Sequence, residues 1–148
     1  MSVRIQSHGF NIGAELEAFC SGRTDAGAMV NFCGIVRHDS ESPLARMVIE
    51  HYPGMTEKSI SKIEDEAKDR WSLIDCLIVH RFGELEPGEP IMMVATLAKH
   101  RAEAFSAAEF LMDYLKSRAP FWKKEIRSCE ASWVASKMSD EAALDRWN

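Results

Sequence analysis

Two lysines in the carboxyl-terminal third of the chain are the side chains best placed to do chemistry. Lys116 lies at the edge of an apolar helical stripe beside Met112, because a helix turns by about 100° per residue. Lys123 follows a proline and an aromatic pair. Burial and neighbouring positive charge both lower the pKa of an amine, which suits it to nucleophilic or acid–base work. The alternative is a pair of solvated charges, with Lys116 held by Asp113 or Glu109, but its place on the stripe favours function.

A second basic group surrounds the start of the same helix. Lys99, His100 and Arg101 stand where the helix dipole favours acidic residues. Free backbone N–H groups with cationic side chains around them favour a bound anion such as a phosphate. Arg37 ends a predicted strand beside a glycine, and its planar guanidinium also suits phosphate. The sequence therefore predicts one cationic pocket built on a buried helix.

The other reactive side chains are interpreted as structural. His51 and His80 are expected to be hydrogen-bonded structural histidines, and Cys33 a core thiol rather than a persulfide carrier, since no base stands near it in sequence. Phe121 and Trp122 are expected to pack rather than to stack on a ligand. The four cysteines form no C-x-x-C pair and the histidines are not at ligand spacing from them, so neither a metal site nor a disulfide framework is predicted. No P-loop, GxSxG or HExxH motif occurs.

Charge is distributed unevenly along the chain. The 148 residues carry a formal net charge of -5, yet residues 99–127 hold seven basic and four acidic side chains. A basic segment on an otherwise acidic protein favours a specific anionic ligand over nucleic acid or an anionic membrane surface. No apolar run of transmembrane length occurs, and the amino-terminal residues lack the apolar centre of a signal peptide, so a cytoplasmic protein is expected.

Hydrophobic periodicity predicts the scaffold, a single α+β domain over residues 1–148. Asn11 is expected to cap the first helix and Thr56 the second, and Gly34 to mark either a bulge in its strand or the close approach of another group. The apolar stripe of the third helix is expected to comprise Phe105, Ala108, Met112 and Leu115, widened by Ala104 and Leu111. Strands are expected over residues 3–6, 28–36, 47–52, 76–80, 91–98 and 128–134, helices over 12–20, 56–70 and 99–119, and a short helix or loose end over 139–148.

Five ordered blocks of sequence carry a family resemblance. They are FCGIVR (32–37), IEHYPGMTEK (49–58), HRFGELEPGE (80–89), HRAEAF (100–105) and DYLKSRAPFWKKE (113–125). Together they resemble the large, catalytic subunit of molybdopterin synthase over nearly the whole chain. The order and number of the blocks make the resemblance specific, whereas any one block alone would not be.

The resemblance implies a fold, an assembly and a reaction. The fold is an α/β hammerhead-type domain with a mixed or antiparallel sheet and a long buried helix. The assembly is a homodimer that binds two small ubiquitin-like sulfur-carrier subunits, forming a heterotetramer. The reaction transfers sulfur from the carrier's C-terminal thiocarboxylate to cyclic pyranopterin monophosphate (precursor Z), making the dithiolene of molybdopterin. No metal or cofactor is implied.

The resemblance also implies residue roles. The catalytic positions fall on Lys116 and Lys123. Lys137 stands where some members carry an Arg that reaches the partner protomer's site, and Lys cannot reproduce a bidentate Arg contact. The implied substrate-binding residues are Ile35, Val36, Arg37, His100, Arg101, Lys116, Lys123, Lys124 and Glu125.

Two other classes of function stay open on the residues alone. One is a non-catalytic module that binds a ubiquitin-like tail, in which the lysines serve only as charge partners. The other is a nucleotide- or RNA-binding domain that uses Phe121, Trp122 and the basic cluster, although the acidic remainder of the chain weakens it. Turnover separates the enzyme from the binding module.

Overall fold

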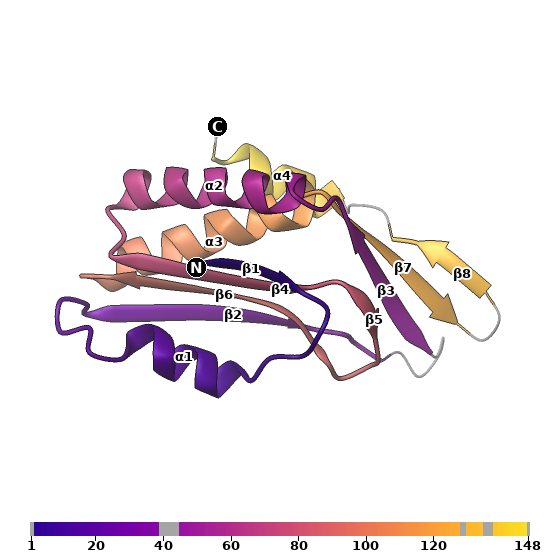
Figure 1. The fold of residues 1–148 in the computed structure, drawn as a ribbon. Coiled ribbons are helices and arrows are strands. Elements are labelled where there is room, and N and C mark those ends of the chain that lie inside the picture. Colours follow the sequence, from indigo (N-terminus) through magenta and orange to yellow (C-terminus); the bar gives the residue numbers. More distant parts are fainter. Residues whose placement is uncertain (1, 39–44, 128–129, 135–137, 148) are drawn as a thin grey trace.

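A computed structural model gives the fold, and it describes residues 2–38, 45–127, 130–134 and 138–147 (Figure 1). The helices are α1 (Ile12–Cys20), α2 (Met55–Trp71), α3 (Arg101–Ser117) and α4 (Met138–Asp145). The strands are β1 (Val3–Gln6), β2 (Ala28–Ile35), β3 (Arg46–His51), β4 (Asp75–Arg81), β5 (Gly83–Leu85), β6 (Pro90–Ala98), β7 (Phe121–Arg127) and β8 (Glu130–Trp133). The expected α+β class is confirmed.

The first sheet forms the centre of the molecule. Its strand order is β1-β4-β6-β2, with β1 parallel to β4 and the other pairs antiparallel. Figure 1 shows α2 and α3 over one face and α1 under the other. Because both faces are covered, β4 and β6 are continuous apolar runs that are buried along almost their whole length. The mixed sheet that the resemblance implied is present, because β1 runs parallel to β4 and the other pairs are antiparallel.

The second sheet was not predicted as a separate unit. Its order is β5-β3-β7-β8, with every pair antiparallel. The run that forms β7 contains two lysines and a glutamate and shows no clear apolar alternation, so the sequence indicated only a turn there. Pairing with β3, whose residues lie 70 to 80 positions earlier in the chain, makes it a strand. The predicted edge strand over 128–134 is realised as β8 at residues 130–133.

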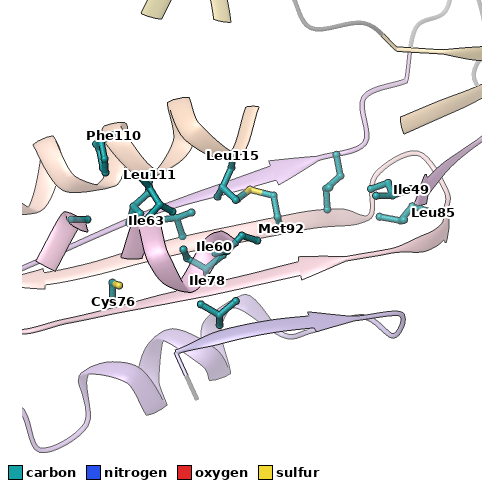
Figure 2. Close-up of a cluster of buried hydrophobic side chains, with 14 of the residues drawn as sticks. Ile49, Ile60, Ile63, Cys76, Ile78, Leu85, Met92, Phe110, Leu111 and Leu115 are labelled. Atoms are coloured by element: carbon teal, nitrogen blue, oxygen red, sulfur yellow. The ribbon is translucent and has the colours of Figure 1, made fainter. Parts of the chain in front are cut away.

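The main core lies between the first sheet and the two long helices (Figure 2). Ile60 and Ile63 of α2 and Leu111 and Leu115 of α3 meet Ile78 of β4 there. The predicted stripe of α3 is partly wrong, because Phe105 is 61% exposed. The buried face is rotated from the predicted one and is formed by Ala104, Ala107, Ala108, Phe110, Leu111 and Leu115.

The helix starts show one prediction confirmed and one corrected. Asn11 caps α1, and its Oδ1 accepts a hydrogen bond from the Ala14 N–H at 2.9 Å. Thr56 does not cap α2. Gly54 takes the cap position with φ 84°, a left-handed conformation that suits glycine, and Thr56 lies inside the helix, where its hydroxyl bonds to the backbone of Tyr52.

Candidate functional site

A cavity of about 280 Å³ lies where α3, the first sheet and β7 meet. Its floor and walls are apolar, and the groups that can exchange protons there are two amines, an imidazole and a thiol. An apolar hollow with a few convergent polar groups is the usual form of a small-molecule site. The lining residues are Phe32, Cys33, Gly34, Ile35, His80, Ile91, Met92, Met112, Leu115, Lys116 and Lys123.

The two predicted catalytic lysines both line this cavity. Lys116 comes from the last turn of α3, next to Leu115 and Met112, as the helical spacing predicted. Lys123 comes from β7, opposite Ile49 of β3. The roles assigned to the lysines stay predictions, but the structure brings the two side chains together.

Strand alternation separates Lys123 from its neighbour. Successive side chains of a strand point to opposite faces, so Lys124 lies on the other side of β7. There its Nζ stands 4.5 Å from the centre of the Trp133 ring, a cation–π contact. Lys124 is absent from the cavity lining, although the resemblance implied a substrate-binding role for it.

The electrostatics of Lys123 differ from those of a surface lysine. Its pKa is lowered from 10.5 to about 8, chiefly by burial and also by the positive charge of Lys116, while Asp140 opposes the shift. No described residue forms a hydrogen bond or ion pair with its amine, because the lining around it is largely apolar. At pH 7 on the order of a tenth of Lys123 is therefore the free amine, the form that accepts a proton, which is far more than for a lysine with an ordinary pKa.

His80 is a cavity residue that the sequence analysis missed. The prediction of a hydrogen-bonded structural histidine is correct as far as it goes, since Nδ1 lies 2.8 Å from the Arg81 carbonyl oxygen. Its ring also stacks on Phe121, with centroids 3.7 Å apart, and lines the cavity. Burial lowers its pKa to about 3. The only sequence signal was its place at the start of the block over residues 80–89.

Strand β2 forms the wall opposite the lysines. The register against β6 shifts between Gly34 and Ile35, which confirms the predicted bulge. Cys33 lines the cavity rather than the core, and burial raises the pKa of its thiol, so a reactive thiolate is disfavoured. Val36 is buried and exchanges backbone hydrogen bonds with the turn before β6, while Arg37 is exposed.

The second predicted basic group does not reach this cavity within one chain. His100 and Arg101 are exposed at the start of α3, and Lys99 and His100 line a separate hollow beside Trp71. Arg101 and Lys116 are fifteen residues apart on one helix, which places their backbones about 22 Å apart at 1.5 Å per residue. The prediction of one cationic pocket is therefore wrong for a single chain, and the helix length implied by the sequence was the signal that could have shown it.

Two further predicted residues take other positions. Glu125 forms an ion pair with Arg127 at 2.5 Å on β7. Lys137 lies outside the described residues.

Among residues 2–38, 45–127, 130–134 and 138–147, no group of His, Cys, Asp or Glu side chains could hold a metal ion. No helix in the same ranges is long and apolar enough to cross a membrane.

Comparisons with known proteins place this chain in a family. A family model described as MoaE protein matches residues 5–118. A molybdopterin synthase catalytic subunit from Cereibacter sphaeroides is 61% identical over 147 residues, covering 99% of this chain and all of the relative. The Escherichia coli protein of the same name is 45% identical over 139 residues, covering 93% of this chain and 92% of its own.

Solved structures agree. A molybdopterin biosynthesis MoaE protein from Burkholderia ambifaria superimposes with a TM-score of 0.84 at 49% identity, covering 99% of this chain and 97% of its own. Molybdopterin synthase from Staphylococcus aureus superimposes with a TM-score of 0.84 at 28% identity, covering 91% and 98%. By the extent of the family match and the identity to full-length relatives, the chain belongs to the MoaE family.

Proposed function

We propose that this chain is the catalytic subunit of a molybdopterin synthase, which transfers sulfur from the thiocarboxylate of a small ubiquitin-like carrier to precursor Z. The single observation that carries the proposal is the convergence of Lys116 and Lys123 in one largely apolar cavity. Its support outside the site is the family membership and the name shared by its full-length relatives.

The chemistry of the transfer sets what the cavity must supply. Each sulfur replaces an oxygen of the pterin side chain, so a carbon–sulfur bond forms there and a carbon–oxygen bond breaks, with the oxygen leaving as water. The acyl–sulfur bond of the carrier also breaks, and an attacking water supplies the oxygen that turns the carrier's thiocarboxylate into a carboxylate. Negative charge develops on the acyl oxygen and on sulfur, and the attacking water loses a proton. A cationic amine stabilises the negative charge, and a free amine accepts the proton from water. The stabilisation of charge is strong because the cavity is largely apolar.

The electrostatics suggest how the two roles divide. Lys123 is the better proton acceptor, since burial and Lys116 hold its pKa near 8. Lys116 is fixed by the last turn of α3 and provides the positive charge opposite it. The raised pKa of Cys33 argues against a persulfide on this chain, so the sulfur passes directly between the two substrates.

A second copy of the chain would bring the anion-binding residues to the cavity. Strand β2 is an edge of its sheet, and its Phe32 and Ile35 are 44% and 56% exposed beside the exposed Phe105 of α3. A groove of about 450 Å³ between β2 and α3 adds to this apolar surface. Exposed apolar patches of this kind mark protein interfaces. We therefore place a homodimer contact on this face, with His100 and Arg101 serving the substrate of the partner's cavity.

The carrier subunit requires an apolar surface of its own beside the cavity. Trp122 and Tyr52 lie with ring centroids 6.1 Å apart, and both are exposed, as is Trp133 on β8. These aromatic side chains flank the strand that carries Lys123. We place the carrier beside these side chains. A hollow lined by Trp122, Trp133 and Lys123 gives its C-terminal tail a route to Lys123.

The test is turnover with defined substrates. The chain is mixed with thiocarboxylated carrier and precursor Z, and molybdopterin is measured in a single turnover. Lys116→Ala and Lys123→Ala are each expected to lower the rate by about 10²–10⁴-fold while carrier binding is kept. Lys124→Ala, whose side chain lies on the opposite face of β7, is the matched control and is expected to change the rate little.

The outcomes separate the enzyme from a binding module. A chain that binds the carrier and never forms molybdopterin is a module, and the proposal is then wrong. Equal losses for Lys123→Ala and Lys124→Ala, or normal turnover by Lys116→Ala, would leave the enzyme intact but overturn the assignment of roles.

A further inference from the structure

His80 is held in one position and one tautomer, although the chemistry proposed above assigns it no role. Its ring is 3% exposed and lies nearly parallel to Phe121, at 12° and 3.7 Å between centroids. Its Nδ1 lies 2.8 Å from the carbonyl oxygen of Arg81. A carbonyl oxygen only accepts hydrogen bonds, so Nδ1 carries the hydrogen of the neutral ring. A stacked face and a backbone bond together leave the imidazole no freedom to turn.

The other ring nitrogen is then a free acceptor. Nε2 of His80 has no hydrogen-bond partner among the described residues. It is also not among the fully buried side-chain atoms that lack a partner, so part of its surface is accessible. The ring lines the cavity together with Lys116 and Lys123. The Nε2 lone pair therefore opens on that cavity, and a largely buried acceptor is stable only if it finds a donor.

The environment of His80 keeps this acceptor neutral. The pKa of the ring is lowered to about 3, chiefly by burial, while the hydrogen bond to the Arg81 backbone opposes the shift. Three groups on three elements add to the lowering: Lys123 of β7, His51 of β3 and Lys116 of α3. Asp140 of α4 acts on Lys123 in the opposite direction. His80 is consequently not a proton shuttle near neutral pH. It is a fixed hydrogen-bond acceptor.

Lys123 is a donor that lines the same cavity as His80. Phe121 and Lys123 alternate on the same face of β7, about 6.8 Å apart along the strand, and Phe121 carries the stacked imidazole. The Lys123 amine has no other hydrogen-bond partner among the described residues. The two groups line one cavity but are not bonded to each other in this structure. We propose that His80 is a positioning residue: when the Lys123 side chain turns towards the ring, Nε2 accepts a hydrogen bond from its amine and holds that amine towards the reacting atoms. Only the catalytic consequence rests on the proposed function.

Two substitutions separate the acceptor from the structural role. His80→Asn keeps an amide N–H close to the place of Nδ1, so the bond to the Arg81 carbonyl survives while the Nε2 acceptor is lost. His80→Gln reaches the place of Nε2 with its amide oxygen and keeps the acceptor. His51→Asn is the matched control, because His51 contacts Phe82 at 4.6 Å between ring centroids and lies outside the cavity lining.

The first measurement needs no substrate. The rate at which an acetylating reagent modifies Lys123 is followed against pH by mass spectrometry of the isolated chain. An acceptor stabilises the ammonium form more than the amine, so His80→Asn is expected to lower the midpoint by roughly 0.5–1 unit, while His80→Gln and His51→Asn leave it in place. If the midpoint is the same in all four proteins, the proposal is wrong.

The second measurement is single-turnover molybdopterin formation. His80→Asn is expected to lower the rate by about 10–100-fold with carrier affinity unchanged, and His80→Gln to stay within about threefold of the parent chain. Equal losses in both variants with an unchanged Lys123 midpoint indicate a packing role and overturn the proposal. If the parent chain forms no molybdopterin, the proposed function fails, whereas the acetylation result still decides whether His80 holds Lys123.

A variant that does not fold leaves a direct test in the intact chain. The ¹⁵N chemical shift of His80 Nε2 reports whether that nitrogen accepts a hydrogen bond. The shift is expected to move towards that of a free acceptor in Lys123→Met. An identical shift in the two proteins would show that Lys123 is not the donor.

Discussion

At the scale of single residues, the site depends on a lysine that the fold accommodates at a cost. Lys123 is held where burial and the charge of Lys116 both oppose its ammonium form. A group whose folded pKa is depressed in this way is useful as a proton acceptor, and it destabilises the protein whenever it is charged. Function and stability therefore act against each other at this position.

The first prediction concerns that conflict. Lys123→Met keeps the length and apolar stem of the side chain and removes the buried charge. It is expected to raise the free energy of unfolding at pH 7 by about 1–3 kcal/mol while abolishing turnover. Lys124→Met is the control, since its amine lies over Trp133 and no gain is expected from removing it. Urea unfolding of the three proteins measures the difference.

The pH dependence of that gain follows from the sign of the shift. Between pH 8 and 10.5 the unfolded chain binds more protons at Lys123 than the folded chain, because the folded pKa is about 8 and the ordinary value is 10.5. Stability due to this residue therefore rises with pH across that window. The advantage of Lys123→Met should shrink as pH rises above 8, and an advantage that stays constant to pH 10 would contradict the depressed pKa.

At the scale of elements, the site depends on where α3 begins and ends. The last turn of α3 presents Lys116 to the cavity, and its first turn presents His100 and Arg101 to solvent. The backbone of Gly27 packs closely against residues 98 and 99, which lead into α3. The Gly27 N–H donates to the Ala98 carbonyl at 3.0 Å.

The second prediction tests that approach. A Cβ atom at Gly27 would lie 2.2 Å from the backbone oxygen of Lys99, so the backbone itself must move. Gly27→Ala is expected to destabilise the fold by about 1–3 kcal/mol and to weaken substrate binding through the displaced segment before α3. Gly9→Ala, which meets nothing within 4 Å, is expected to stay within about 0.5 kcal/mol of the parent chain. Denaturation midpoints and apparent substrate affinity check both variants.

At the scale of the whole molecule, the two basic groups belong to opposite ends of one helix. A substrate with a reacting pterin and a phosphate cannot contact Lys116 and Arg101 of the same chain across about 22 Å. The exposed apolar face of β2 and α3 offers a contact through which a second copy could supply the missing group. A site shared between two copies has a signature that single variants lack.

The third prediction is complementation. Lys116→Ala and Arg101→Ala chains are each expected to form little molybdopterin, Arg101→Ala chiefly through weaker substrate binding. Mixing them with exchange of subunits should restore activity, because half of the sites in each mixed dimer combine an intact Lys116 with an intact Arg101. The control mixes Lys116→Ala chains with Lys123→Ala chains. Both lysines belong to the same cavity, so this mixture is not expected to restore turnover.

The controls for that experiment are set by the arithmetic of the mixture. A dimer of Lys116→Ala and Lys123→Ala chains has one lysine missing from each cavity, so no site is complete and no recovery is expected. Recovery in that control, or none with Arg101→Ala, would show that the substrate is not shared between chains in the way proposed. A sedimentation measurement that finds only monomer at micromolar concentration would also contradict the shared site.

Much of the scaffold could be predicted from sequence because its signals are local. The cap and apolar spacing of α1, the continuous apolar run of β6 and the glycine bulge of β2 depend on residues a few positions apart. The same holds for Lys116, whose place beside Met112 follows from helical periodicity alone. These elements were predicted within a residue or two of their observed bounds.

The sequence by itself determined the α+β class, the long elements and the pairing of Lys116 with Lys123 as candidates. Only the tertiary structure decided that the segment of Lys123 is a strand, which side of it faces the cavity, and that His80 forms part of the wall. It also decided that His100 and Arg101 stand apart from that cavity. The physical reason is the range of the interactions: periodicity and capping act within one turn or one strand, whereas the pairing of β7 with β3 and the stacking of Phe121 on His80 join residues far apart in the chain.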